Sequence, residues 1–153
     1  MTENIDQIDR KILSELQSDA SQSIESIAET VSLSRNACWR RIKQMEEAGI
    51  IKARVALLDA GKLGLGLPVF VLVHAADHSP QWLEKFHRAV RVMPEIIGAH
   101  RMSGELDYVL RVQVADVADY DRFYKRLIEL VPLRDISASF VMENIKDTTA
   151  LPL

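Results

Sequence analysis

Residues 31–49 read VSLSRNACWRRIKQMEEAG, and this stretch decides how the first part of the chain is interpreted. Ser34 is of a residue type that caps the start of a helix, and Gly49 is of a type that ends one, so the sequence predicts a helix between them. Successive residues of a helix are turned by about 100°. This turn places three apolar residues together on one side, a seam that we expect to be buried: Cys38, Ile42 and Met45.

Two further amphipathic segments precede this helix. Apolar residues recur at spacings of three and four from Ile5 to Leu16, which predicts a helix that ends near Ser18. A second, short helix is predicted over residues 23–30, with a tight connection before Ser34. Three helices with a short turn before the last are typical of a helix-turn-helix. The next stretch, IIKARVALL at 50–58, is rich in β-forming residues and predicts a strand pair or wing.

The outer face of the third predicted helix is cationic. Between Ser34 and Met45 the sequence has four basic residues and no acidic one. Arginine bonds guanine through two hydrogen bonds, asparagine recognises adenine, and the amides of a helix start attract phosphate. The alternative is an ordinary solvated helix face. The pattern makes this helix a candidate for the major groove of DNA, with these contact residues: Ser34, Arg35, Asn36, Trp39, Arg40, Arg41 and Lys43.

Two residues of this helix have competing interpretations. Cys38 lies on the predicted seam, which favours a small core residue over a redox sensor, because thiol reactivity requires exposure. Trp39 lies on the flank of the seam. Partial packing against the wing or the first helix is favoured for Trp39 over contact with DNA, because bases in a duplex are already paired.

The second part of the chain contains two successive strand–helix–strand units, and each helix ends at a proline. The predicted ranges are 69–76, 80–92 and 96–101, then 108–114, 119–131 and 136–143. This order predicts a βαββαβ sandwich, a four-stranded antiparallel sheet with two helices on one face, and an α+β chain. Three glycines and a proline in DAGKLGLGLP, residues 59–68, indicate a linker. The predicted domains are therefore 1–59 and 69–153, with a hinge over 60–68.

The loop MSGELDY, residues 102–108, joins the two central predicted strands. A free amino acid needs an acceptor for its ammonium group and donors for its carboxylate. Asp107 offers the acceptor, and the amides around Gly104 with the hydroxyls of Thr148 and Thr149 offer the donors. The alternative is a hairpin with a polar turn.

Composition excludes several classes of protein. The chain has 153 residues with a net charge of −3, an ordinary composition for a globular protein. A single cysteine forbids an intrachain disulfide and fits a reducing cytosol, and the acidic stretch at 1–6 is unlike a secretory leader. The longest apolar stretch, 63–73, is too short to span a bilayer. His74 and His78 lack a third metal ligand at a plausible spacing, and catalytic motifs are missing, so neither a metal site nor an enzyme is expected.

These motifs, taken in order, resemble the Lrp/AsnC (feast/famine) regulators over essentially the whole chain. The similar segments of the first part are DRKIL at 9–13, SLS at 32–34, CWRRI at 38–42, EAGII at 47–51 and ALLD at 56–59. Those of the second part are LG at 63–64, SGELDY at 103–108 and IKDTTALPL at 145–153. The resemblance implies a winged helix-turn-helix joined to a ferredoxin-like, ACT-like (RAM) sandwich.

The resemblance also implies a function, that of a cytoplasmic, bacterial or archaeal regulator of amino-acid metabolism. Such a protein needs no cofactor or membrane, binds near-palindromic double-stranded DNA, and assembles as homodimers, tetramers or octamers around an amino-acid effector. The effector residues carried over from the family are Met102, Ser103, Gly104, Asp107, Tyr108, Asp135, Thr148 and Thr149. Cys38-Trp39, with the 55–59 and 63–66 segments, is similar to members that respond to cysteine.

The sequence departs from the family at two positions. Glu105 stands where many relatives have Asp, and Asn36 occupies a variable reading position, so neither effector nor operator sequence transfers. An alternative of a different class stays open from the residues alone: an accessory subunit of a metabolic enzyme, with the sandwich as a small-molecule sensor and the head as a protein-binding element.

Overall fold

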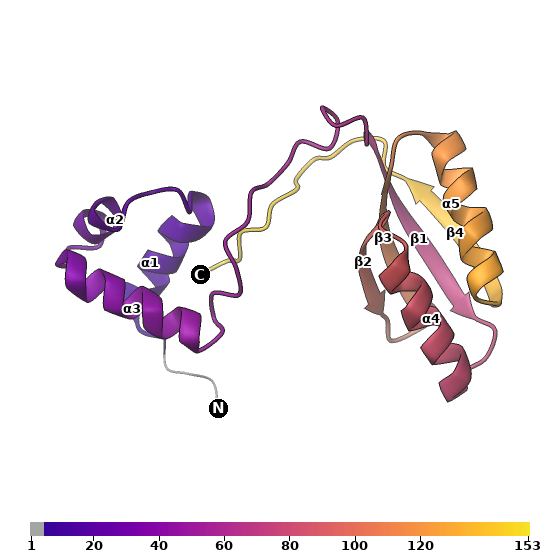
Figure 1. The fold of residues 1–153 in the computed structure, drawn as a ribbon, viewed down its shortest axis with the longest axis horizontal. Helices are drawn as coiled ribbons and strands as arrows, with labels where there is room; N and C mark the ends of the chain where they lie inside the picture. The colour runs from indigo at the N-terminus through magenta and orange to yellow at the C-terminus, as the bar shows by residue number, and fades with distance from the viewer. Residues whose placement is uncertain (1–4) are drawn as a thin grey trace. The chain divides into compact units, whose positions relative to one another are not determined.

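The computed structural model describes residues 5–153, so part of the acidic 1–6 stretch lies outside the described residues (Figure 1). The chain divides into two compact units. The first comprises the described residues up to Leu57 together with Lys146–Leu153, and the second comprises Leu58–Ile145. The helices of the described part are all too short or too polar to cross a bilayer.

The first unit is a three-helix head made of α1 (Gln7–Ser18), α2 (Ile24–Thr30) and α3 (Arg35–Glu47). Each helix begins at a side-chain cap, as the sequence predicts for α3 at Ser34: the oxygens of Asp6, Ser23 and Ser34 accept backbone N–H groups of the first turns. The predicted seam is confirmed, because its three residues belong to the buried core of the head: Ile12, Leu16, Ile27, Ala28, Val31, Cys38, Ile42 and Met45.

The ends of α2 and α3 are set by two residues with positive φ. Ser32 has a φ of 57° in the turn before α3, and the N–H of Leu33 closes that turn on the carbonyl of Ala28 at 2.8 Å. Gly49 has a φ of 73° directly after α3, which is the left-handed conformation that glycine adopts without a Cβ penalty. The prediction of a helix that stops at Gly49 is confirmed.

Residues 50–58 differ from the prediction, because this stretch forms no strand in the described chain. A strand requires a hydrogen-bonded neighbour, and none of the described residues supplies one here. The predicted strand pair is therefore wrong for the single chain. The segment leaves its apolar side chains in solvent, with Val55, Leu57 and Leu58 73–74% exposed.

The C-terminal tail also departs from the predicted domain boundary at 69–153. The side-chain amide of Gln17 on α1 donates to the carbonyl of Leu151 and accepts from its N–H, both at 2.8 Å. Lys146–Leu153 therefore belongs to the head and not to the second unit. The sequence could not predict this contact, because Gln17 and Leu151 are far apart along the chain and only the tertiary structure brings them together.

The second unit is the predicted sandwich. Its elements are β1 (Leu67–Ala75), α4 (Pro80–Val92), β2 (Ile96–Arg101), β3 (Tyr108–Val114), α5 (Val117–Leu130) and β4 (Leu133–Phe140). The strands pair antiparallel in the order β2-β3-β1-β4. The βαββαβ prediction is confirmed, although the last strand begins three residues earlier than the predicted 136.

Both helices of this unit cover one face of the sheet. Alternate β1 residues, Val69, Val71 and Val73, are at most 1% exposed and share a core with Trp82 and Phe86 of α4 and with Phe123 of α5. The indole N–H of Trp82 donates to the carbonyl of Pro132 at 2.6 Å and so ties α4 to the start of β4. Within the second unit, none of the described helices covers the opposite face of the sheet, and there Phe70 is 43% exposed.

Candidate nucleic-acid interface and ligand loop

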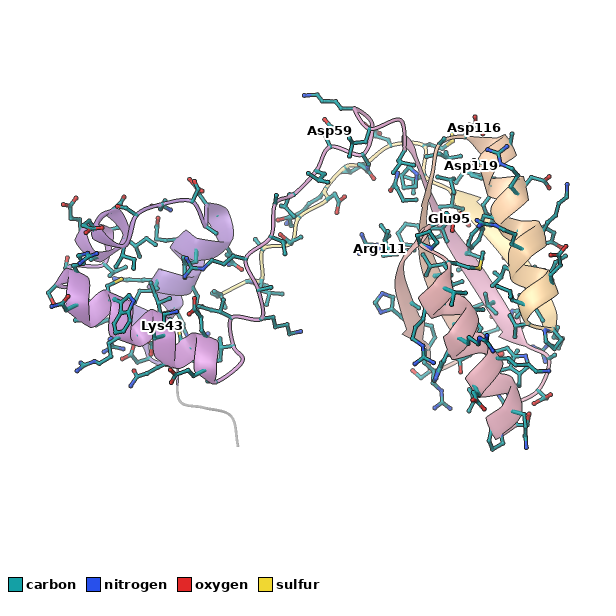
Figure 2. All side chains as sticks on the ribbon, viewed as in Figure 1. Lys43, Asp59, Glu95, Arg111, Asp116 and Asp119 are labelled. Atoms are coloured by element: carbon teal, nitrogen blue, oxygen red, sulfur yellow. The ribbon has the colours of Figure 1, made fainter. Side chains whose placement is uncertain are left out.

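On the outer face of α3, the residues predicted to contact DNA bases are exposed to solvent. Asn36, Arg40 and Lys43 are exposed, and Trp39 is 49% exposed, whereas the neighbouring Cys38 is fully buried. Burial raises the pKa of the Cys38 thiol, which fits a core residue. Ser34 is engaged as the N-cap, with its Oγ accepting from the N–H of Ala37 at 3.3 Å. Figure 2 shows the side chains of the head, with Lys43 labelled on α3.

The basic side chains of α3 differ in their ion pairs. Arg35 pairs with Glu25 of α2, and Lys43 pairs with Glu46 at 2.6 Å. The Arg35–Glu25 pair is exposed on both sides, and the Lys43 side chain is 47% exposed, so water and salt compete with these pairs and the cations remain exchangeable. Within residues 5–153, the Arg40 guanidinium has no carboxylate at ion-pair distance. Arg40 is therefore the cation of this face with the fewest contacts to give up.

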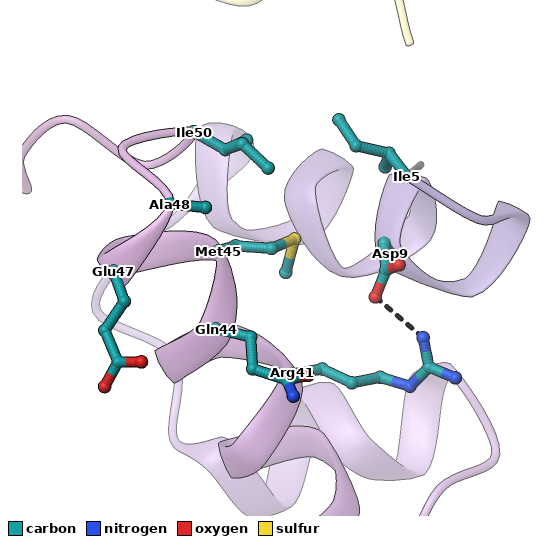
Figure 3. Close-up of a pocket in the computed structure, with 8 residues that line it drawn as sticks. All are labelled: Ile5, Asp9, Arg41, Gln44, Met45, Glu47, Ala48 and Ile50. Atoms are coloured by element: carbon teal, nitrogen blue, oxygen red, sulfur yellow. Dashed lines mark hydrogen bonds and ion pairs between the residues drawn. The ribbon is translucent and has the colours of Figure 1, made fainter. Parts of the chain in front are cut away.

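Arg41 occupies a different environment from the other predicted reading residues. Its guanidinium lies 2.7 Å from the carboxylate of Asp6 and 2.8 Å from that of Asp9, and its side chain is 28% exposed. Figure 3 shows this side chain reaching from α3 to Asp9 on α1. The hydrogen bonds to Asp9 and then to Asp6 raise the pKa of Arg41. The pKa of Asp6 is lowered, first by the backbone N–H of Asp9 and then by Arg41.

The Arg41 contacts fasten the middle of α3 to the start of α1. Beside them lies a hollow of about 520 Å³, open on one side (Figure 3); its lining residues are Ile5, Asp9, Arg41, Gln44, Met45, Glu47, Ala48 and Ile50. From the sequence, helix geometry places Arg40 on the outer face and Arg41 on its flank, and both are expected to contact DNA. In the structure, their side chains are directed to different surroundings.

The loop between β2 and β3 is held at three points. The N–H of Met102 donates to the carbonyl of Asp107 at 2.9 Å, and the N–H of Asp107 donates to the carbonyl of Val73 at 3.2 Å. The Asp107 carboxylate accepts the N–H of Ala75 at 2.8 Å. Gly104 has a φ of 119° at the tip of the loop, a value that a side chain would strain. This arrangement leaves the backbone around Gly104 open to solvent.

The structure reveals a neighbour of Asp107 that the sequence did not suggest. The imidazole Nε2 of His78, in the β1–α4 connection, lies 3.7 Å from the second carboxylate oxygen of Asp107. The two residues belong to separate connections, and only the pairing of β1 with β3 brings those connections together. Sequence spacing therefore contains no signal for this contact.

The other predicted effector residues are dispersed. Tyr108 is 5% exposed, and its ring packs 4.4 Å from that of Phe86, so it belongs to the core beneath the loop. Asp135 is exposed on β4 opposite His74 of β1. Met102 and Ser103 are exposed in the loop. Thr148 and Thr149 are exposed in the tail of the first unit.

A helix-turn-helix head with a cationic exposed α3, followed by a βαββαβ domain, defines a DNA-binding regulator of two domains. Residues 5–52 match the family model of a winged helix-turn-helix DNA-binding domain, and residues 68–151 match that of the Lrp/AsnC ligand binding domain. The chain belongs to the Lrp/AsnC family of transcriptional regulators. This membership favours the regulator over the accessory enzyme subunit that the residues alone left open.

Known proteins similar to this chain span nearly its whole length. The DNA-binding transcriptional activator DecR of Escherichia coli K12 is 51% identical, over 97% of this chain and 99% of its own. The crystal structure of an AsnC family regulator from Agrobacterium tumefaciens has a TM-score of 0.93 at 50% identity, covering 96% of both chains. A regulator from Neisseria meningitidis, solved in complex with L-methionine, has a TM-score of 0.93 at 35% identity, covering 97% of both chains.

Proposed function

We propose that this chain is an amino-acid-responsive regulator that inserts α3 into the major groove of near-palindromic operators as a dimer or a higher oligomer. The observation that carries the proposal is the outer face of α3, where Asn36 and Arg40 are exposed and Arg40 has no carboxylate partner within residues 5–153. A guanidinium that gives up no internal ion pair on binding retains its full capacity for the two hydrogen bonds to guanine. Its place of action is the cytoplasm, where the operator lies.

The acidity of the whole chain does not oppose DNA binding. The net charge is −3, but the cations of α3 act over a short distance, because salt screens charges beyond about 8–10 Å. Arg35, Lys43 and the free amides at the start of α3 serve as phosphate contacts that set the orientation of the helix. Arg41 acts one step back, as a positioning residue that holds α3 against α1.

The direct experiment is selection of duplexes from a random pool by the full-length protein, followed by affinity measurements at several salt concentrations. We expect related sequences with two half-sites about 10 bp apart or a multiple of that spacing. We also expect an affinity that falls linearly on a log–log plot against salt. Retention of random duplexes as strongly as selected ones would refute a sequence-reading role. Metabolite turnover is not expected for this regulator.

Self-assembly is proposed on the basis of two apolar surfaces that the single chain leaves open. The helix-free face of the sheet exposes Phe70, with Leu72 and Val109 half-buried beside it. Figure 2 shows Arg111 projecting from β3 on the side away from α5. The strand-like 50–58 segment is the second surface, and a second copy would supply the hydrogen-bonded neighbour that it lacks. Light scattering should therefore give a mass that is a multiple of 17.3 kDa.

The amino-acid effector is proposed to bind at the loop of residues 102–107. The open backbone around Gly104 offers donors for a carboxylate, and Asp107 offers a negative charge for an ammonium group. The related Neisseria meningitidis regulator was solved with L-methionine, which supports this ligand class. A thermal-shift screen over the twenty amino acids, including cysteine and methionine, should reveal a ligand that raises the unfolding temperature by mass action.

A further inference from the structure

Trp39 is an exposed aromatic side chain that the head does not use for its own packing. The residues that pack around the core of the head are Ile8, Leu13, Ile24, Leu33, Ile50 and Ile51, and Trp39 is not among them. Trp39 is 49% exposed on a helix whose opposite side is buried. Covering this apolar surface with a partner would be favourable, because burial removes apolar area from water.

The indole forms part of a hollow on the outer face of α3. This hollow measures about 450 Å³ and is lined by Ser34, Asn36, Ala37, Trp39 and Arg40. Asn36, Trp39 and Arg40 stand at positions i, i+3 and i+4, which are neighbours on a helix surface. The indole is therefore an apolar wall beside two groups suited to base edges, whereas the Ala37 methyl lies on the other flank of those groups.

The chemistry of the major groove restricts what this apolar wall can meet. Paired bases present their edges there, so an indole cannot stack on them without opening the duplex. The edges are hydrogen-bond donors and acceptors, with one apolar exception, the C5-methyl group of thymine. An indole beside an arginine and an asparagine matches a thymine adjacent to the base pairs that those two residues contact.

We propose that Trp39 reads the C5-methyl group of a thymine in each half-site of the operator. The inference rests on the proposed DNA-binding function and adds a specificity residue to it. It makes Trp39 a discriminator between thymine and any base that lacks the methyl group at that position. Arg40 and Asn36 supply polar recognition beside it, so the apolar contact also fixes the register of the helix along the groove.

The test uses the tightest duplex that the full-length wild-type protein selects from a random pool. Each thymine is replaced in turn by deoxyuridine, which removes one methyl group and keeps every hydrogen bond. We expect one position in each half-site where the dissociation constant rises about fourfold, the factor that corresponds to one buried methyl group. Replacement in both half-sites should raise the dissociation constant about fifteenfold, because distant sites contribute additively.

Variants then assign the methyl preference to Trp39. Trp39→Ala should bind thymine and deoxyuridine duplexes equally, and Trp39→Phe, which keeps an aromatic wall, should retain part of the preference. Lys43→Ala is the matched control on the same face. Its loss of a phosphate contact should weaken both duplexes by the same factor and leave the preference intact.

The outcomes separate this inference from the function on which it rests. A deoxyuridine scan that is flat at every position, or a methyl preference that survives Trp39→Ala, would overturn the role of Trp39 while DNA binding stands. A pool from which the wild-type protein retains no preferred duplex would overturn the regulator proposal and this inference with it. The scan on the wild-type protein does not depend on how well any variant folds.

Discussion

The neighbouring residues Arg40 and Arg41 should affect different properties when each is replaced by alanine: operator affinity for Arg40 and the stability of the head for Arg41. Arg40 has no carboxylate partner within residues 5–153, so Arg40→Ala should change the free energy of unfolding by less than about 0.5 kcal/mol. If Arg40 bonds a guanine through two hydrogen bonds, its loss costs about 1–3 kcal/mol of binding per half-site. That range corresponds to a dissociation constant that is about 5 to 150 times higher.

Arg41→Ala should act on the stability of the head instead. The Asp9 carboxylate in its ion pair is 15% exposed, so this contact is better shielded than an ordinary surface pair. Removing it should lower the free energy of unfolding by about 1 kcal/mol. For a domain of this size, that loss lowers the unfolding temperature by about 4–8 °C. Operator affinity measured well below that temperature should fall by less than about fivefold.

The assay pairs scanning fluorimetry with fluorescence anisotropy on the selected duplex at one salt concentration. Arg35→Ala serves as the control, because its pair with Glu25 is exposed on both sides and should add no measurable stability. The reasoning would be refuted if Arg41→Ala weakened operator binding more than Arg40→Ala and left the unfolding temperature unchanged. That result would place Arg41 on the DNA and break its contact with α1.

Three further perturbations test the remaining assignments. Asp107→Asn keeps an acceptor for the Ala75 N–H and removes the negative charge. Effector binding measured by calorimetry should therefore be lost, while the unfolding temperature stays within about 2 °C of wild type. Effector binding at full strength would mean that no ammonium group contacts this carboxylate. Phe70→Glu should lower the mass measured by light scattering toward 17.3 kDa, and an unchanged mass would exclude the open sheet face from the assembly. The backbone N–H of Asp9 and then Arg41 hold the folded-state pKa of Asp6 below its ordinary value of 3.8, so its stabilising effect is present above that pH and is lost as the pH falls through the folded pKa. The unfolding temperature of wild type should therefore exceed that of Asp6→Asn at pH 6 and approach it near pH 3. A constant difference would contradict the lowered pKa of Asp6.

The two-unit construction limits how an effector could act on DNA. A ligand changes DNA affinity only if it binds one assembly, or one spacing of two heads, better than another. The loop of residues 102–107 lies in the second unit, whereas α3 lies in the first. Effector and operator binding are therefore best compared in the full chain, by titrating the effector at several concentrations of the selected duplex.

The sequence was a good guide wherever the structure follows from local periodicity. The seam of α3, its cap at Ser34 and its stop at Gly49 depend on residues within that helix or at its ends, so they could be predicted. The order of strands and helices after the linker depends on alternation of apolar residues, which the helix-covered face of the sheet confirms.

The sequence by itself determined the class of the protein, because a helix-turn-helix and a βαββαβ unit each leave a periodic pattern in one dimension. Only the tertiary structure decided which charges are already paired. Arg40 and Arg41 are adjacent and alike in charge, but Arg41 reaches from α3 to Asp6 and Asp9 at the start of α1. It also joined Gln17 to Leu151 and excluded a strand at 50–58 within one chain. Hydrogen bonds and ion pairs act over a few ångströms, so the partners of a side chain are fixed by how elements pack and not by their spacing along the chain.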